Sequence, residues 1–193
     1  KKKKKKKKVT RYRDDTGARV SGPLQLYGTA YDFYSAGDNL TYADHNEIVT
    51  SQILQGNFPL DPTGLYLVLL SADVKSQDFC TSICGYHSYA PIAGQKVVIA
   101  VIMDGMSCDS SPGIDAMINV LAHELTEALS DPFLDAWVTH TTSGSIVENA
   151  DKCNLLFGNR VKTLSNSAKW NLEVGGEKFY IQLMIVTPYT VFH

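Results

Sequence analysis

Two continuous apolar runs and one apolar stripe of helical period organise the chain. Residues 65–74 and 96–104, which read LYLVLLSADV and KVVIAVIMD, predict strands inside a sheet, because apolar runs of this length suit buried strands. Residues 112–130 predict a central helix, whose apolar stripe consists of Ile114, Met117, Ile118, Leu121, Leu125 and Leu129. A separate polar row of Asn119, His123 and Glu127 follows the same helix at four-residue steps.

The remaining patterns predict a shorter helix, a hairpin and an arm. Residues 41–55 predict a helix with Thr41 as its N-cap and Gly56 past its end. Residues 77–95 are interpreted as a loop, and Gly175–Gly176 predicts the turn of a hairpin between residues 170–174 and 177–186. The expected fold is α+β. We expect a single domain over residues 41–193, with a mixed sheet packed on the central helix, and an extended N-terminal arm over residues 9–40.

Charge narrows the range of partners. Eight of the 18 basic residues form the run Lys1–Lys8, so the rest of the chain carries ten basic residues against 20 acidic ones. An acidic body argues against nucleic acid as a partner. The lysine run is interpreted as a tag, a placeholder or a basic arm. No apolar run approaches the ~20 residues of a membrane helix, and no signal peptide is present, so a secreted protein would appear here in processed form.

The cysteines and one sequon indicate an extracellular setting. Cys80, Cys84, Cys108 and Cys153 form an even set without a CxxC spacing, which fits two disulfides better than a zinc knuckle and leaves three pairings open. Asn39-Leu40-Thr41 is a glycosylation sequon. The alternative is a reduced intracellular protein with a chance sequon.

The sequence HELTE at residues 123–127 carries the candidate chemistry. His123 and Glu127 share one helix face and can hold one ion, with Glu124 beside them to activate a bound water. A zinc site of this kind needs a third protein ligand, and Glu148, 25 residues after His123, is the best candidate. In the metal-free alternative, His123 and the acidic residues would hydrogen-bond across a buried polar seam.

The segment HELTEALSDPFLDAWVTHTTSGSIVENAD, residues 123–151, resembles the active-site segment of the thermolysin-type zinc peptidases, the gluzincins. The resemblance implies a zincin-like fold in which His123 and Glu148 bind zinc, Glu124 is the general base and Asp151 orients His123. Glu127 stands where those enzymes have a second histidine. Two carboxylates and one imidazole leave a zinc site formally neutral, so it polarises a carbonyl less and oxygen-loving ions compete better.

Two further groups of residues have open roles. His87, in the sequence CGYHSY, is either an extra ligand or hydrogen-bond donor at the cleft, or a structural histidine bonded to the loop backbone. Tyr27, Tyr31 and Tyr34 in the arm either stack on sugars or pack the arm against the body or against a neighbouring subunit.

A longer resemblance covers residues 40 to 186. The sequences GLYLVLLSADV, FCTSICGYHS, GIDAMINVLAHELTEALSDPF, ENADKC and VGGEKFYIQLMIV occur in this order and resemble the phosphate-induced protein 1, or EXORDIUM-like, family. The resemblance implies a secreted protein whose partners are extracellular-matrix or cell-wall components. It favours a structural or assembly role, with self-assembly through the arm, on a degenerate metalloprotease-like fold. The alternatives are a metal-dependent peptidase or hydrolase, and a carbohydrate-binding wall protein.

Overall fold

The computed structural model describes residues 12, 19–20, 22–104, 113–187 and 190–192. The run Lys1–Lys8 and Cys108 lie outside these described residues. The fold is α+β, as the sequence predicted, with two α-helices and several small sheets in the described part.

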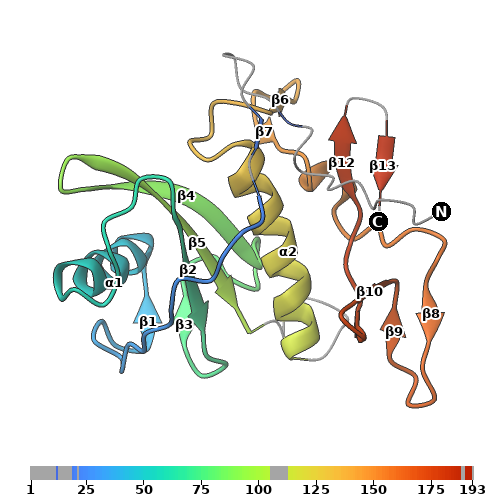
Figure 1. Cartoon of the computed structure of the whole chain (residues 1–193), viewed down its shortest axis with the longest axis horizontal. Helices are drawn as coiled ribbons and strands as arrows, with labels where there is room; N and C mark the ends of the chain where they lie inside the picture. The colour runs from blue at the N-terminus through green and yellow to red at the C-terminus, as the bar shows by residue number, and fades with distance from the viewer. Residues whose placement is uncertain (1–11, 13–18, 21, 105–112, 188–189, 193) are drawn as a thin grey trace.

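The core of the fold is a three-stranded mixed sheet of order β2-β5-β4 (Figure 1). Strand β2 (Leu65–Leu70) runs parallel to β5 (Gln95–Met103), and both coincide with predicted strands. Strand β4 (Gly85–Ile92) runs antiparallel to β5 and pairs with it from Gly85↔Ile102 to Ile92↔Gln95. The interpretation of residues 77–95 as a loop is therefore wrong over β4, because β4 pairs with β5 in a hairpin whose two-residue turn, Ala93-Gly94, has positive φ at both residues.

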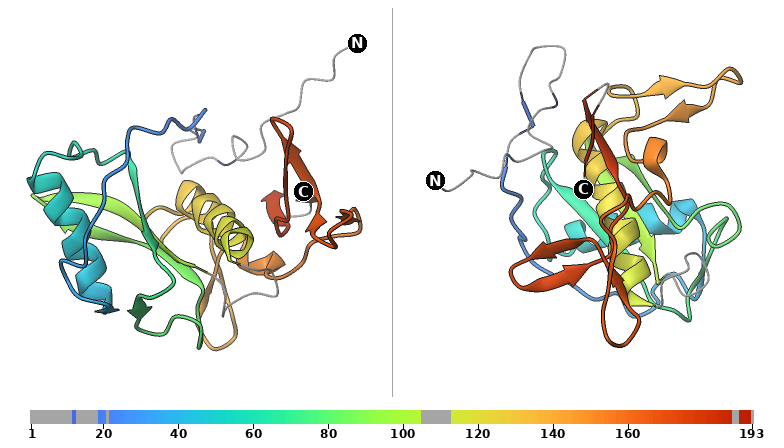
Figure 2. Two further views of the ribbon diagram at one scale, coloured as in Figure 1. Left: turned by 90° about the horizontal axis from the view of Figure 1, so that it is seen from below. Right: turned by 90° about the vertical axis from the view of Figure 1, so that its right-hand side faces the viewer.

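Alternate residues of β5 face the two helices. Val97, Ile99 and Val101 join the apolar cluster that includes Ile48, Val49 and Ile53 of α1 (Tyr42–Leu54). Ala100 and Ile102 pack instead with Met117 and Val120 of α2 (Ile114–Ser130). The sheet thus lies between the two helices, with α1 on one face and α2 on the other (Figure 2).

Helix α1 begins as its sequence predicts. The Thr41 backbone N–H donates to the Asp44 carboxylate at 2.7 Å, and the Asp44 N–H donates back to Oγ1 of Thr41 at 3.4 Å, which completes a capping box. Gln55 is the C-cap, and Gly56 follows with a φ of 80°.

Helix α2 forms where the sequence predicts it, and it buries part of the polar row as well as part of the apolar stripe. Ile114, the first residue of the predicted apolar stripe, is 64% exposed, whereas Asn119 and Glu127 of the polar row are each 3% exposed. The polar row faces β4 and the chain after residue 147, where its side chains line the cleft described below. The apolar stripe therefore identified the helix, and the polar row identified the face that lines the cleft.

Short strands complete the molecule: β8 to β13 lie on the other side of α2 from the central sheet, whereas β1 and β3 lie on the side of α1 (Figure 1). The predicted hairpin at Gly175–Gly176 is confirmed, although its strands are shorter than expected. The elements are β1 (Asn39–Leu40), β3 (Lys75–Ser76), β6 (Thr139–His140), β7 (Ile146–Val147), the 3₁₀ helix η3 (Asp151–Cys153), β8 (Lys162–Thr163), β9 (Lys169–Trp170), β10 (Leu172–Val174), β11 (Glu177–Phe179), β12 (Met184–Thr187) and β13 (Thr190–Phe192). Neither helix of the described chain has the length and apolarity that crossing a membrane requires.

The described part of the N-terminal arm contacts the body at both ends, through Tyr12 at one and through Tyr34 and β1 at the other, and is exposed in between. Tyr12 is buried, its hydroxyl donates to the carbonyl of Ile185, and its ring meets Trp137 edge-to-face with centroids 4.8 Å apart. Tyr27 and Tyr31 are about four-fifths exposed, at 78% and 80%. Packing of these two tyrosines against the body, one of the expected roles, is therefore not found.

The cysteines depart from the expected two disulfides. Cys80 is disulfide-bonded, whereas Cys153 is a buried free thiol at the end of η3. Burial raises the pKa of the Cys153 thiol. The predicted disulfide of Cys153 is therefore not formed in the described structure.

Candidate functional site

A cleft of about 280 Å³ lies between β4, α2 and the chain after β7. It gathers residues from four separate stretches of the sequence. The residues that line it are Ser82, Ile83, Cys84, Gly85, Tyr86, His87, Asn119, Val120, His123, Glu124, Glu127, Glu148, Asp151, Asn154, Leu155 and Gln182. Every residue predicted as a catalytic, metal-binding or supporting group of the HELTE site is among them.

Gly85 allows α2 to approach β4 closely. A Cβ atom at this position would lie 2.5 Å from Cγ1 of Val120 and 3.1 Å from Oε1 of Glu124. Any larger residue would displace the helix or the glutamate, so the glycine at the start of β4 is a requirement of the site.

The first group of side chains surrounds His123. Its Nε2 atom lies 3.2 Å from Oε2 of Glu127, four residues later on α2, and 3.4 Å from Oδ1 of Asp151. One ligand atom from each of these three residues lies within 4.8 Å of the other two. The i, i+4 pair forms as predicted, and η3 supplies the third side chain.

Backbone groups hold Glu127 in place. Its Oε1 atom accepts hydrogen bonds from the N–H groups of Ala150 and Asp151, at 3.0 and 2.9 Å. These bonds fix the carboxylate and leave Oε2 turned toward His123. The segment after β7 is thus tied to α2 through the same residue that faces the histidine.

Gln182 completes the surroundings of His123. Its side-chain amide contacts Nδ1 of His123, and its backbone N–H donates to Oδ1 of Asn119 at 2.8 Å. Asn119 is the first residue of the polar row, so every member of that row has a role at the cleft. The sequence carried no signal for Gln182, which lies 59 residues from His123.

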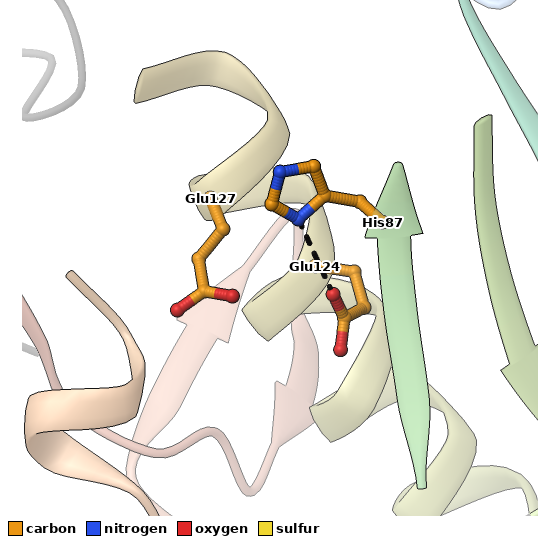
Figure 3. Close-up of side chains that lie close together, drawn as sticks. All are labelled: His87, Glu124 and Glu127. Atoms are coloured by element: carbon orange, nitrogen blue, oxygen red, sulfur yellow. Dashed lines mark ion pairs between the residues drawn. The ribbon is translucent and has the colours of Figure 1, made fainter. Parts of the chain in front are cut away.

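The second group surrounds His87 on β4. Its Nδ1 atom lies 3.7 Å from Oε2 of Glu124, and Figure 3 shows both Glu124 and Glu127 on α2 beside this ring. Its Nε2 atom lies 2.9 Å from the backbone carbonyl of Asp131 and 3.5 Å from Oε1 of Glu148. Because a carbonyl only accepts, Nε2 carries a proton and donates it to Asp131.

Asp151 and Glu148 do not occupy the positions relative to His123 that the sequence analysis expected. Asp151, predicted to orient His123, contributes a carboxylate directly beside its Nε2, while Glu148 faces His87 instead. The Glu148 backbone N–H donates to Oδ2 of Asp151 at 3.1 Å, so a local turn brings Asp151 to α2. The geometry therefore favours His123, Glu127 and Asp151 as a ligand set over the predicted set with Glu148.

The cleft is built to hold positive charge. Burial opposes protonation of His123, but Asp151 and Glu127 outweigh it and raise the pKa of His123 to about 11. Burial likewise opposes protonation of His87, whose pKa is nevertheless raised by Glu124 and Glu148. Burial raises the pKa of the Glu124 and Glu148 carboxyl groups, with His87 opposing in each case.

Histidines are the only cations that pair with these carboxylates in the described part of the chain. Oε1 of Glu148, a residue 9% exposed, has no hydrogen-bond donor, and neither has Oδ2 of the fully buried Asp131. A buried carboxylate oxygen without a donor costs stability, so the site as a whole suits a ligand that carries positive charge.

Comparison with known proteins identifies the family. A sequence profile of the phosphate-induced protein 1 conserved region matches residues 3–113 and 105–165. The chain belongs to the phosphate-induced protein 1 family. It is 29% identical to Protein EXORDIUM-like 5 of Arabidopsis thaliana over 210 residues, which cover 89% of this chain and 58% of that protein. It is also 29% identical to Protein EXORDIUM-like 3 of the same plant, over 79% of this chain and 54% of that protein.

The chain thus spans little more than half the length of these two relatives. No solved structure matches it. The α+β fold and the family are shown, and the resemblance of the HELTE segment to zinc peptidases stays a hypothesis about the site.

Proposed function

We propose that this member of the phosphate-induced protein 1 family is a metal-dependent hydrolase that works outside the cell. One observation carries the proposal: Nε2 of His123 lies 3.2 and 3.4 Å from carboxylate oxygens of Glu127 and Asp151, in a cleft that also holds Glu124. Imidazole and carboxylate together suit zinc and similar divalent ions. The disulfide at Cys80 supports an oxidising, extracellular location.

The residues that line the cleft would have different roles in the reaction. A bound ion would supply Lewis acidity, and two carboxylates with one imidazole would hold it. Glu124, next to His123 in the chain and 5% exposed, would take a proton from a water in the cleft. The N–H of His87 is directed to Asp131, which keeps the ring in position beside Glu124. Zincin-like catalysis with an altered ligand set is the reaction class that this arrangement supports.

Metal content and hydrolysis of the purified chain test the proposal together. We expect the purified chain to retain a divalent ion that is lost in Glu127→Gln, and hydrolysis of a fluorogenic peptide library to be lost in Glu124→Gln. Glu173→Gln, at an exposed position on β10, is the matched control and should change neither result. A chain that binds no ion and hydrolyses nothing under these conditions would refute the proposal.

A structural or assembly role in the extracellular matrix or cell wall is the second candidate. It is supported by the arm, in which Leu26, Tyr27, Tyr31 and Phe33 are each at least 78% exposed. Apolar side chains exposed together usually mark an interaction surface. Replacing Tyr27, Tyr31 and Phe33 by serine should abolish self-association in sedimentation experiments. Loss of binding to soluble wall polysaccharides without any change in association would favour carbohydrate binding instead.

Asn39, the predicted glycosylation site, is exposed on β1, so its side chain is open to modification. Glycosylation of Asn39 remains a proposal and agrees with the extracellular setting. A mass shift removed by a peptide N-glycosidase, when the chain is expressed in a secretory host, would support it.

A further inference from the structure

The two groups of side chains in the cleft share Glu127. His123, Glu127 and Asp151 form one set of potential ligands, and His87, Glu124 and Glu127 form the other. In each set the ligand atoms lie within 4.8 Å of one another. A carboxylate that belongs to two adjacent ligand sets is the usual bridge of a two-metal site, in which the ions lie ~3.5–4 Å apart.

One proton of His87 is fixed on Nε2, the nitrogen on the side away from Glu124. Since Nε2 donates to the Asp131 carbonyl at 2.9 Å, the neutral ring presents the lone pair of Nδ1 to Glu124. A lone pair and a carboxylate repel each other unless a cation or a second proton lies between them. A backbone carbonyl that accepts from the far nitrogen is also the arrangement that orients metal-binding histidines.

Charge balance favours two ions over one. The carboxylates of Glu124, Glu127, Glu148 and Asp151 line the cleft, and no Lys or Arg pairs with them in the described part of the chain. A histidine that binds a metal ion is neutral, so once both histidines are ligands one divalent ion offsets half of this formal negative charge and two offset all of it. Burying uncompensated charge is costly. One ion would leave part of the buried negative charge unbalanced, and a second ion would remove that free-energy cost.

Glu148 provides an independent sign of an unsatisfied site. Its Oε1 atom is buried, lines the cleft and has no hydrogen-bond donor. The nearest histidine nitrogen, Nε2 of His87 at 3.5 Å, already directs its proton to Asp131. This oxygen therefore has ligand capacity that no group of the described chain uses.

We propose that the cleft binds two divalent ions of the Mn²⁺–Zn²⁺ class, with Glu127 as the shared ligand and His87 and Glu124 as ligands of the second ion. This inference rests on the proposed metal site at His123 and deepens it. In the two-ion state Glu124 is a ligand rather than a free base. The substrate class widens accordingly to those that two-metal sites clamp through two oxygens, such as phosphate esters and peptides.

Metal stoichiometry distinguishes the two proposals. The full chain is dialysed against Mn²⁺ or Zn²⁺, freed of excess ion and measured by mass spectrometry of the element. We expect two ions per chain in the wild type, one in His87→Ala and in Glu124→Gln, and two in the control His140→Ala on exposed strand β6. One ion in the wild type that His87→Ala leaves in place would overturn the two-ion site and preserve the hydrolase proposal. No ion at all would overturn both.

A spectroscopic measurement on the wild type needs no variant to fold. Two Mn²⁺ ions bridged by one carboxylate are magnetically coupled, and their electron paramagnetic resonance spectrum differs from that of isolated Mn²⁺. We expect the coupled spectrum in chains loaded with two equivalents. An isolated-ion spectrum at every loading would overturn the shared role of Glu127.

Discussion

Oε1 of Glu127 accepts the backbone N–H of Asp151, 24 residues later, at 2.9 Å, and the carboxylates of both residues flank Nε2 of His123. The same contact therefore fastens the chain after β7 to α2 and assembles the candidate ligand set. We therefore expect fold stability and metal binding to be coupled through this one side chain.

Replacing Glu127 by glutamine should weaken both properties. The amide keeps the shape but accepts the two backbone N–H groups without a charge, so we expect the metal-free chain to lose about 1–3 kcal/mol of unfolding free energy. Metal affinity should fall by more than the ~10–100-fold that loss of a group outside the ligand set costs. Urea unfolding and competition with a chromogenic chelator measure the two effects. Unchanged affinity would show that Glu127 is not a ligand.

Gly85→Ala should separate α2 from β4. The added methyl group would lie 2.5 Å from Val120 and within 3.2 Å of two Glu124 atoms, so we expect a destabilisation of about 1–3 kcal/mol. Hydrolysis, if present, should fall because Glu124 moves. Gly28→Ala is the matched control, since its nearest neighbour would be Phe58 at 4.0 Å. Equal thermal stability of the two variants would contradict the close approach of helix and strand.

His45 should make stability depend on pH. The ring is fully buried between the Tyr86 and Ser76 hydroxyls, at 2.8 and 3.1 Å, and burial lowers the pKa of His45 below its usual 6.5. The unfolded chain therefore takes up a proton near pH 6.5 while the folded chain does not. Stability should fall as the pH drops through this value, by up to about 1.4 kcal/mol for each pKa unit of lowering, until the folded ring is protonated as well.

Comparison with His45→Gln isolates this contribution from the other titrating groups. The difference in unfolding free energy between the two chains, measured from pH 7.5 to 5, should narrow as the pH falls. A difference that stays constant or widens over this range would show that His45 is not buried as a neutral ring.

Cys153 should react slowly as a thiol in the folded chain. It is 2% exposed and burial raises the pKa of its thiol, so both access and the thiolate fraction are reduced. Labelling with iodoacetamide should be slow in buffer and fast in urea, with Cys153 identified by peptide mass spectrometry. Recovery of Cys153 in a disulfide-linked peptide from the untreated protein would contradict its assignment as a free thiol.

Local sequence determined the main elements of the fold and one pair of residues at the site. The Thr41 cap begins α1, the apolar runs form β2 and β5, and a four-residue step places His123 and Glu127 on one face of α2. Helical periodicity decides such relationships because they depend only on neighbours along the chain. The family resemblance over residues 40 to 186 was also readable from its motifs, and the profile match confirms the family.

Only the tertiary structure decided which distant residues complete the site. It placed His87 on β4, a strand that the sequence did not predict. It also brought Asp151 rather than Glu148 to Nε2 of His123, and it placed the Gln182 side chain beside Nδ1 of His123. It also buried the polar row of α2 and left Ile114 exposed. Contacts between residues 24 to 59 positions apart follow the path of the chain and the packing of the sheet, which periodicity along a single element does not encode.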